Sequence, residues 1–455
     1  MTLLDIQPLR TTFQGDLLTP ETSGYDAACR IWNASVNKRP ALIARCSGLA
    51  DIIAAVNFAR ENGLLTAIRG GGHNVGGRAL CDDGIVIDLS RMRAVHVDPA
   101  QRTVRVQGGA TLGDLDRETH AFGLAVPCGI VPKTGIGGLT LGGGVGWLVR
   151  KYGMTIDNLL SCQIVTADGK VLTASPSENE DLFWALRGGG GNFGVVASFE
   201  FQAHPVLTVL GGLLLYPRAA AVDVIRHFRG YMASAPDELT AYTALLHGPD
   251  GAPLVGVIPC YCGEIVEGQR ILEPLRTFGN PVADTIQALP FPAMQALLAP
   301  SFPDGNHNYW KSTLQRELSD DAIDVIVEHA NRMQSPVSAV VLEYYAGAAG
   351  RVAGDATAFP HRALPWGIYF IAQWTDPAET VTHRDWARAG EERLIPFSSN
   401  AHLLSALDVE PEDVICTAFG ANLARLTAVK TQYDATNFFR VNYNIRPALT
   451  KAALA

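Results

Sequence analysis

The stretch AIRGGGHNVGG, residues 67–77, places one histidine, His73, between two glycine clusters. Glycines beside a strand are typical of a backbone that passes close to a ligand, because a β-carbon there would collide with it. Two further glycine-rich stretches, 135–146 and 188–194, lie in the same half of the chain. Together the three stretches predict a long ligand contacted along its whole length, and a dinucleotide is the natural candidate.

The second glycine-rich stretch does not fit the common dinucleotide-binding pattern. That pattern needs GxGxxG directly after a strand, at the start of a helix, with an acidic residue about 20 positions later. Here GGLTLGGGVGWL (137–148) follows VPCGIVPKTG (126–135), a loop that contains two prolines. An NAD-dependent dehydrogenase is therefore disfavoured.

Apolar periodicity predicts a mixed α and β first half. Helical spacing is expected over 47–63, 112–122 and 178–187, and strands over 64–70, 84–90 and 195–201. Two alternating pairs, 94–106 and 161–175, predict hairpins. The glycine clusters lie at the joints between these elements.

Beyond about Pro205 the pattern changes to long alternating strands with amphipathic helices between them. Strands are expected over 207–217, 253–262, 338–347 and 366–374, and helices over 219–233 and 321–333. This pattern predicts an antiparallel sheet covered on one face by helices. The fold class is therefore α+β, with two domains in 455 residues.

Composition excludes several classes of partner. Lys and Arg number 36 against 45 Asp and Glu, a net charge of −9, and the basic residues are scattered, which argues against nucleic acid. The chain has no apolar run of about 18 residues, and MTLLDIQPLRTTFQGDL (1–17) does not resemble a secretory signal. The eight cysteines have no metal-ligand spacing. We expect a cytoplasmic protein without a metal or a membrane partner, and the sequence leaves the oligomeric state open, a homodimer included.

Four motifs occur in order along nearly the whole chain: RGGGHN (69–74), TGIGGLTLGGGVGWLVRKYGMTIDNLLS (134–161), DLFWALRGGGGNFGVV (181–196) and RLTAVKTQYDATNFFRVNYNI (425–445). Together they resemble the berberine-bridge-enzyme-like branch of the FAD-linked oxidases with the p-cresol methylhydroxylase fold. The resemblance implies an FAD-binding domain over 1–205, with its motifs in about 36–205. It also implies a substrate-binding domain over 206–424 and a segment, 425–455, that returns to the FAD domain.

The resemblance implies a covalent bond between His73 and the flavin ring. A neutral imidazole nitrogen is a competent nucleophile at cellular pH. The flavin would lie against the first loop, where Gly70, Gly71, Gly72, Gly76 and Gly77 leave room; alternatively, His73 only caps a turn. The FAD-contacting residues implied by the motifs are Arg69, Gly70, Gly71, Gly72, His73, Asn74, Thr134, Gly135, Gly138, Leu141, Gly142, Gly143, Gly144, Gly146, Val196, Asn442, Tyr443 and Asn444.

Some members of the family attach the flavin a second time, through a cysteine four residues before the first glycine of the second motif. Counting back from Gly135 gives Val131 at that position, whereas Cys128 lies three residues earlier. The register therefore argues against a second bond through Cys128.

The resemblance also implies a catalytic base in the second domain, on a strand two residues before a tyrosine, with FPHR (359–362) downstream. Counting back from His361 gives Glu343 as the base, followed by Tyr345. Alternate residues of a strand share a face, so the two side chains can share a pocket. Alternatively, Glu343 is a surface residue and Tyr345 only packs against the sheet. The tyrosine base of the family's sugar and cannabinoid oxidases has no counterpart in AHLLSALD (401–408).

The sequence thus predicts an FAD-dependent oxidase. It would remove a hydride from a C–H next to O or N of a small hydroxylated or amine-bearing ring compound, such as an alkaloid, a sugar or another secondary metabolite, with O2 as acceptor and H2O2 as product. The modest size of Thr134, where relatives control oxygen access, is compatible with an oxidase. An FAD-dependent dehydrogenase, an oxidative cyclase of secondary metabolism and a flavin-binding protein without turnover are the alternatives.

Overall fold

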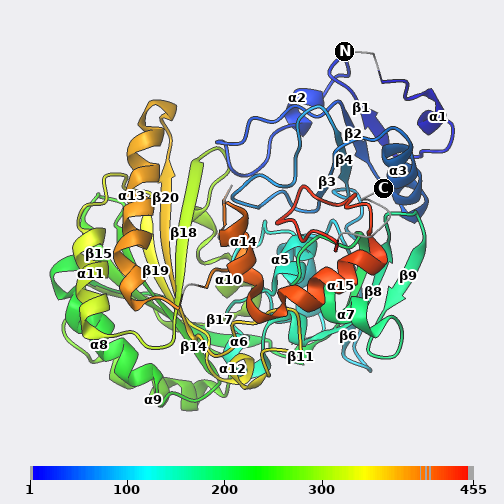
Figure 1. The fold of residues 1–455 in the computed structure, drawn as a ribbon. Helices are drawn as coiled ribbons and strands as arrows, with labels where there is room; N and C mark the ends of the chain where they lie inside the picture. Colours follow the sequence, from blue (N-terminus) through cyan, green and yellow to red (C-terminus); the bar gives the residue numbers. More distant parts are fainter. Residues whose placement is uncertain (1–3, 400, 405–406, 409–410, 449–455) are drawn as a thin grey trace.

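The computed structural model describes residues 4–399, 401–404, 407–408 and 411–448. Figure 1 shows two lobes side by side: the first is built from the N-terminal half of the chain, and the second contains one large sheet with helices on its outer face. The C-terminal helices pack back on the first lobe. This arrangement confirms the predicted α+β class.

The first lobe contains two main sheets. The four-stranded sheet has the order β1 (Asp16–Leu18), β2 (Leu42–Arg45), β4 (Ile85–Asp88) and β3 (Thr66–Arg69). The five-stranded antiparallel sheet has the order β5 (Val95–Asp98), β6 (Thr103–Gln107), β10 (Val195–Gln202), β8 (Leu159–Val165) and β9 (Val171–Ala174). Both predicted hairpins, β5–β6 and β8–β9, are present.

Helices connect these strands and border the glycine-rich loops. The predicted helices are α3 (Leu49–Glu61), α4 (Leu112–His120) and α7 (Glu180–Leu186). Thr111 caps α4 through a capping box with Asp114. The second glycine-rich stretch forms the short helix α5 (Ile136–Gly142), followed by α6 (Val149–Tyr152). Strand β7 (Leu124–Ala125) pairs with β11 (His204–Pro205) where the first lobe ends.

The second lobe is built on a nine-stranded sheet. Its strands are β16 (Ala283–Asp284), β13 (Leu214–Pro217), β15 (Pro253–Tyr261), β14 (Leu239–His247), β19 (Ala339–Tyr344), β20 (Trp366–Trp374) and β18 (His307–Gln315), with β12 (Thr208–Gly211) and β17 (Gln287–Pro290) paired off this path. All its pairings are antiparallel, as predicted. The single strand predicted over 207–217 is wrong: Gly212, at φ 153°, separates β12 from β13.

The two faces of this sheet have different partners. Val340, Leu342 and Phe370 pack under α8 (Ala221–Met232), α11 (Asp320–Ala330) and α13 (Thr380–Leu394). The opposite face, which includes Tyr242 and Tyr369, packs toward the first lobe. Because successive side chains of a strand alternate between faces, the sheet presents every second residue to the space between the lobes. Helices α9 (Ile265–Arg276) and α10 (Phe291–Ala296) complete this lobe.

The C-terminal segment is anchored to the third glycine-rich loop. Helices α14 (Glu412–Phe419) and α15 (Leu423–Tyr433) contribute to the core of the first lobe (Figure 1). Lys430 is fully buried, pairs with Asp434 at 2.6 Å and donates to the Asn192 carbonyl at 2.7 Å. A buried charge of this kind is tolerated because it is both paired and hydrogen-bonded.

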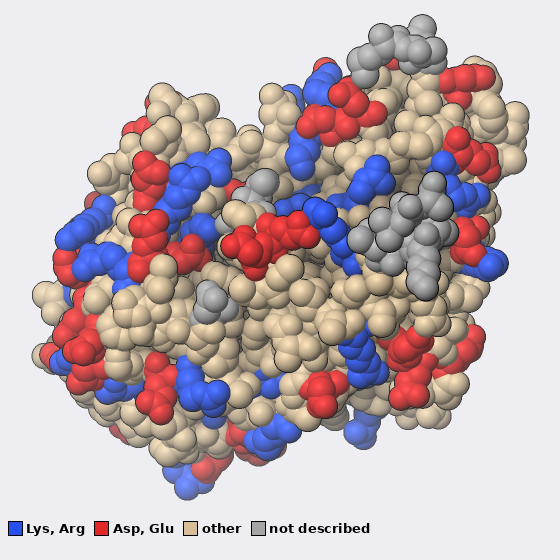
Figure 2. All heavy atoms as spheres, viewed as in Figure 1, with Lys and Arg blue, Asp and Glu red and all other residues tan. Residues whose placement is uncertain are grey.

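Acidic and basic side chains are intermixed over the face drawn in Figure 2. Within the described residues, no helix is both long enough and apolar enough to cross a membrane. The described residues also contain no group of histidine, cysteine and acidic side chains suited to hold a metal ion.

Candidate active site

Two cavities meet at His73. The first, here called the glycine-lined cavity, lies inside the first lobe between the three glycine-rich loops and the C-terminal segment. The second, here called the apolar cavity, lies between the lobes, with a volume of about 630 Å³. The residues that line both cavities are His73, Thr134, Leu139 and Gly142. The two cavities therefore lie next to each other and share this boundary.

The structure brings most of the predicted FAD-contacting residues to the glycine-lined cavity. Those that line it are Gly70, Gly71, Gly72, His73, Asn74, Thr134, Gly135, Gly138, Leu141, Gly142, Val196, Asn442 and Tyr443. The three loops are far apart in sequence and come together because the end of β3, helix α5 and the start of β10 border the same cavity.

The remaining predicted residues lie elsewhere. Arg69 lies behind the first loop, where its guanidinium pairs with buried Asp88 at 2.5 Å. Gly144 faces the apolar cavity. A β-carbon on Gly143 would meet Met154, and one on Gly146 would meet the Cys128 carbonyl. Asn444 does not line the glycine-lined cavity.

The first loop needs its glycines mainly for contacts between backbones. A β-carbon on Gly71 would lie 2.4 Å from the Gly135 amide nitrogen, and β-carbons on Gly76 and Gly77 would meet Asp408 and Val36. By contrast, β-carbons on Gly138 and Gly142 would meet no atom within 4 Å, although both residues line the cavity. The glycines that leave room for a ligand are therefore mainly those of helix α5, and not those of residues 70–77.

This contrast makes two matched substitutions informative. Gly71→Ala is expected to lower the free energy of unfolding by about 1–3 kcal/mol, because two backbones must separate. Gly138→Ala is expected to leave the fold intact, with a helix-propensity gain of up to about 1 kcal/mol, while its methyl group blocks the cavity. Thermal unfolding of flavin-free protein, together with the flavin-to-protein absorbance ratio, checks both. Full flavin content in Gly138→Ala would contradict the placement.

His73 has a buried nitrogen without a partner. Its Nε2 atom makes no hydrogen bond in the described structure, and its ring stacks on Trp32 with centroids 4.2 Å apart and planes 12° apart. Burial lowers the pKa of His73 to about 4. The imidazole is therefore neutral near pH 7, with a free lone pair or N–H at the boundary of the two cavities.

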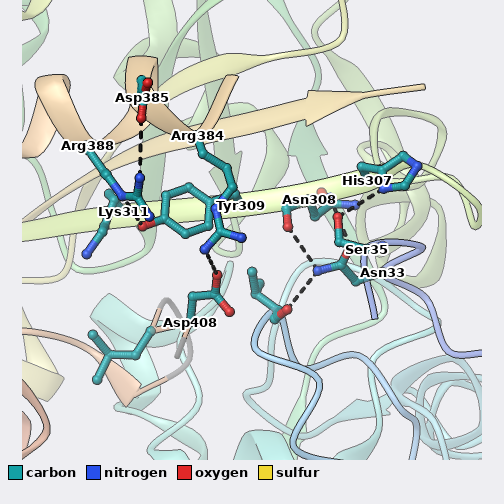
Figure 3. Close-up of polar contacts among 12 residues, drawn as sticks. Asn33, Ser35, His307, Asn308, Tyr309, Lys311, Arg384, Asp385, Arg388 and Asp408 are labelled. Carbon is teal, nitrogen blue, oxygen red and sulfur yellow. Dashed lines mark hydrogen bonds and ion pairs between the residues drawn. The ribbon is translucent and has the colours of Figure 1, made fainter. Parts of the chain in front are cut away.

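The position of Trp32 depends on a contact between the lobes. Figure 3 shows Asn33 next to β18 of the large sheet. The Asn33 amide nitrogen donates to the Val75 carbonyl at 2.7 Å and to the Asn308 carbonyl at 2.9 Å, while its Oδ1 accepts from the Asn308 backbone amide. The Trp32 indole donates to the Phe302 carbonyl at 3.1 Å. Contacts to both lobes thus hold the ring that stacks on His73.

Further polar contacts between α13, β18 and residue 408 lie close to this junction. Arg384 stacks on the Tyr309 ring, 4.4 Å from its centroid, and pairs with Asp408 at 3.4 Å (Figure 3). Arg388 donates to the Tyr309 hydroxyl at 3.1 Å. Asp408 follows the segment that includes Leu404, which lines the glycine-lined cavity.

The C-terminal tail closes the glycine-lined cavity. Asn442 donates to the Gly191 carbonyl at 2.8 Å, and Asn74 donates to the Tyr443 hydroxyl at 3.2 Å. Arg78 lies over the Tyr443 ring, 4.4 Å from its centroid, and also lines the cavity. The tail thus joins the first and third glycine-rich loops.

Glu343 faces the apolar cavity from β19. The register pairs it with Tyr242 on β14, and both side chains line the cavity together with Tyr369. The Tyr345 hydroxyl donates to Glu343 Oε2 at 2.6 Å and also contacts the Tyr369 hydroxyl. Burial raises the pKa of Glu343 to about 7, against the opposing effect of the Tyr345 and Tyr369 hydrogen bonds. A carboxylate with a pKa near neutrality is suited to accept a proton.

Tyr345 and the FPHR segment have supporting positions. Tyr345 is buried behind Glu343, outside the lining of the apolar cavity. His361 contacts the Ala418 carbonyl at 3.1 Å, and Arg362 pairs with Asp157 at 2.6 Å. Of this group, only Phe359 lines the cavity.

Cys128 lies away from both cavities. Its sulfur accepts from the Gln295 amide at 3.4 Å, and the same amide donates to buried Asp116 at 3.2 Å. Burial raises the pKa of the Cys128 thiol. Val131, the residue at the expected register, lines the apolar cavity instead.

Sequence reasoning missed Trp32, Arg78, Tyr242 and Tyr369 as site residues. Tyr242 and Tyr369 lie on alternating strands, but alternation does not tell which face meets the other lobe. Trp32 precedes the first motif by many residues, so no local signal connects it with His73.

Comparison with known proteins agrees with this geometry. Residues 40–175 match the FAD binding domain family, and residues 412–446 match the family described as berberine and berberine like. These two segments carry the first two glycine-rich stretches and the C-terminal tail that close the glycine-lined cavity.

Similar proteins cover nearly the whole chain. (R)-6-hydroxynicotine oxidase of Paenarthrobacter nicotinovorans is 34% identical over 455 residues, which cover 96% of this chain and 97% of that protein. An FAD-linked oxidoreductase of Dictyostelium discoideum is 34% identical over 420 residues, covering 91% of each chain. The solved structure of 6-hydroxy-D-nicotine oxidase from Arthrobacter nicotinovorans has a TM-score of 0.88 at 33% identity, covering 96% of this chain and 99% of that one. This chain therefore belongs to the berberine-bridge-enzyme-like FAD-linked oxidoreductases, with the two-domain p-cresol methylhydroxylase fold.

Proposed function

We propose that this protein is an oxidase whose FAD is bound covalently to His73 and whose base is Glu343. The observation that carries the proposal is the boundary at His73, Thr134, Leu139 and Gly142, where the glycine-lined cavity opens on the apolar cavity that contains Glu343. The substrate would be a hydroxylated or amine-bearing ring compound, O2 the acceptor and H2O2 the product. The enzyme would work in the cytoplasm.

The residues of the glycine-lined cavity fit an FAD. The open space above Gly138 and Gly142 accommodates a flat group against helix α5. The unpartnered Nε2 of His73 is at the cavity wall, and the low pKa of this imidazole keeps it neutral and nucleophilic. Asn74, Asn442 and Tyr443 line the same cavity and supply polar groups from its rim.

In the proposed reaction, the bound flavin supplies the acceptor for a hydride from the substrate carbon. Glu343 accepts the proton of the adjacent hydroxyl or amine, so that the C=O or C=N bond forms as the hydride leaves. Tyr345 acts as a positioning residue, because its hydroxyl holds Glu343 Oε2 from behind. The apolar walls keep water away from the carboxylate, and this low-dielectric environment strengthens the hydrogen bond between the Tyr345 hydroxyl and Glu343.

Anaerobic mixing tests the proposal. The purified protein is expected to be yellow, and alcohols or amines that enter the apolar cavity are expected to bleach the flavin absorbance band. Admission of air should restore the band with formation of one H2O2 for each turnover. A flavin that no alcohol, amine or sugar reduces would support a non-catalytic flavin protein instead. A flavin reduced by substrate but not reoxidised by O2 would support a dehydrogenase.

The pH dependence of flavin reduction tests Glu343 and Tyr345 together. The reduction rate is expected to rise with pH through about 7, because only the carboxylate accepts a proton and the pKa of Glu343 is raised to about 7. The Tyr345 hydrogen bond lowers that pKa, so Tyr345→Phe should move the midpoint to higher pH. At pH 6 the flavin reduction rate of Tyr345→Phe should be at least about tenfold below that of the wild type, since a hydrogen bond to a charged group contributes about 1.5–3 kcal/mol.

The matched control for this experiment is Tyr344→Phe. Tyr344 packs on Trp366 on the helix-covered face of the sheet, so its loss should leave the midpoint unchanged. An unchanged midpoint in Tyr345→Phe, or a shift to lower pH, would show that Tyr345 does not act on the base.

A further inference from the structure

The wall of the apolar cavity formed by the sheet has its carboxylate at one end, apolar residues in the middle, and the polar side chains of His247 and Gln373 at the other end. Alternate residues of β14 present Tyr242, Ala244 and Leu246, and β19 presents Glu343, Val341 and Ala339 beside them. At about 3.3 Å per residue, the stretch from Tyr242 to Leu246 extends about 13 Å. The cavity continues past it to the hairpin residues 248–249 and the turn residues 336–337. The cavity is therefore elongated, with its carboxylate at one end.

The facing wall is also apolar. The first lobe contributes Val131, Leu139 and Met154, and the second lobe contributes Leu298 and Phe302 from outside the sheet. Among the described residues, no lysine, arginine or aspartate lines this cavity, and Glu343 is the carboxylate that does. A charged substrate body, or one covered in hydroxyl groups, would find few partners here.

At the end near residues 248–249 and 336–337, the Ser338 hydroxyl and the Gln373 amide nitrogen already have partners, whereas Gln373 Oε1 and His247 Nδ1 make no hydrogen bond in the described structure. Ser338 donates to the Gln373 carbonyl at 3.1 Å. The Gln373 amide donates to the Ser301 and Val337 carbonyls at 3.0 and 3.1 Å. A buried hydroxyl group of a ligand left without a partner costs about 1–3 kcal/mol, so a sugar chain would lose this amount several times over.

At the end of the cavity that carries Glu343, one polar group has no partner. Tyr242 is 1% exposed, its hydroxyl makes no hydrogen bond in the described structure, and its ring stacks on Trp147 with centroids 4.8 Å apart. Since buried polar groups are normally hydrogen-bonded, this hydroxyl indicates a ligand atom beside Glu343. The aromatic rings of Tyr242, Phe302, Phe359 and Tyr369 suit a flat apolar body.

From these observations we infer that the substrate is an elongated, mainly apolar molecule with a single oxidisable hydroxyl or amino group at one end. This group binds Glu343 and Tyr242, and the apolar body extends along β14 and β19 toward residues 248–249 and 336–337. We expect oligosaccharides to bind weakly, because the middle of this wall offers few polar partners for their hydroxyl groups. The inference rests on the proposed function and narrows its substrate class.

A panel of matched compounds tests the inference on the holoenzyme. Benzyl alcohol, 4-phenylbenzyl alcohol, the two corresponding amines and cellobiose are titrated, and Kd is taken from the flavin absorbance change or from the saturation of the reduction rate. The second ring should lower Kd at least tenfold, because it buries further apolar area. Cellobiose should bind more weakly than either alcohol.

Variants in the middle of the cavity locate the apolar body. Ala244→Phe should raise the Kd of 4-phenylbenzyl alcohol at least tenfold and that of benzyl alcohol less than threefold. Ala244→Gly, the matched control, should leave both within threefold. Val341→Phe, at the paired position on β19, should act as Ala244→Phe does and replaces it if that variant does not fold.

The outcomes separate the inference from the proposed function. A Kd that does not fall with the second ring, a tighter complex with cellobiose, or equal effects of Ala244→Phe on both alcohols would overturn the inference. Reduction of the flavin by cellobiose would overturn it while leaving the proposed oxidase function intact. The expected order of Kd values without any flavin reduction would support the inference and count against the proposed function.

Discussion

Replacing Glu343 with glutamine is expected to lower the rate of flavin reduction by about 10²–10⁴-fold, the usual contribution of a general base. Glutamine keeps the shape of the side chain and accepts the Tyr345 hydrogen bond, but it cannot take a proton from the substrate. The geometry places no second carboxylate at the apolar cavity among the described residues. Stopped-flow measurement of flavin bleaching under anaerobic conditions checks this result.

The lower rate of flavin reduction in Glu343→Gln must reflect the loss of the proton acceptor and not a loss of folding or of bound flavin. Flavin content and thermal unfolding are therefore expected to match the wild type, and substrate Kd should change little. Glu273→Gln, on the exposed surface of α9, is the matched control and should leave the rate unchanged. Undiminished reduction in Glu343→Gln would show that another group accepts the proton.

Replacing His73 with alanine is expected to abolish covalent attachment of the flavin. The wild-type polypeptide should stay yellow after acid precipitation and carry the added mass of one FAD in an intact-mass spectrum. In His73→Ala, the flavin should appear in the supernatant and the chain should have its unmodified mass. The physical reason is the unpartnered, neutral imidazole at the wall of the glycine-lined cavity, the one nucleophile that lines it among the described residues apart from hydroxyl groups.

A second histidine in the same lobe controls for general effects of the substitution. His96 lies exposed on β5, and His96→Ala should keep the covalent flavin. If His73→Ala retained an acid-stable flavin, the attachment would have to lie elsewhere. Because Cys128 faces Gln295 and Asp116, a Cys128→Ala variant of His73→Ala should not change the released fraction.

Local patterns determined much of the fold. The hairpins β5–β6 and β8–β9 follow from alternation around short turns, and α3, α4 and α7 follow from apolar periodicity, with a capping box at the start of α4. The prediction failed at residues 207–217, where the same apolar alternation runs through Gly212. A positive φ at this glycine lets the chain leave one strand and start the next, and alternation alone does not register such a break.

The candidate site was only partly predictable. His73 and Glu343 were identified by motif and register, but nothing in the sequence indicated that Trp32 stacks on His73 or that Tyr242 lies opposite Glu343. The sequence also assigned Arg69 to the cofactor, whereas the structure pairs it with buried Asp88. A charged side chain next to a cofactor-binding motif can either contact the cofactor or form an ion pair that supports the loop. Only the tertiary packing distinguishes these two roles.

Residue types and their spacing along the chain were sufficient for the fold class, and the resemblance of four motifs to a known family pointed to the loop that carries His73 and the strand that carries Glu343, because periodicity and motifs depend on short-range order. The tertiary structure decided which glycines face a cavity, which aromatic rings surround the carboxylate, and that the apolar cavity is elongated. Those properties depend on how two lobes and a returning C-terminal tail pack together, since contacts between distant segments have no period or motif of their own.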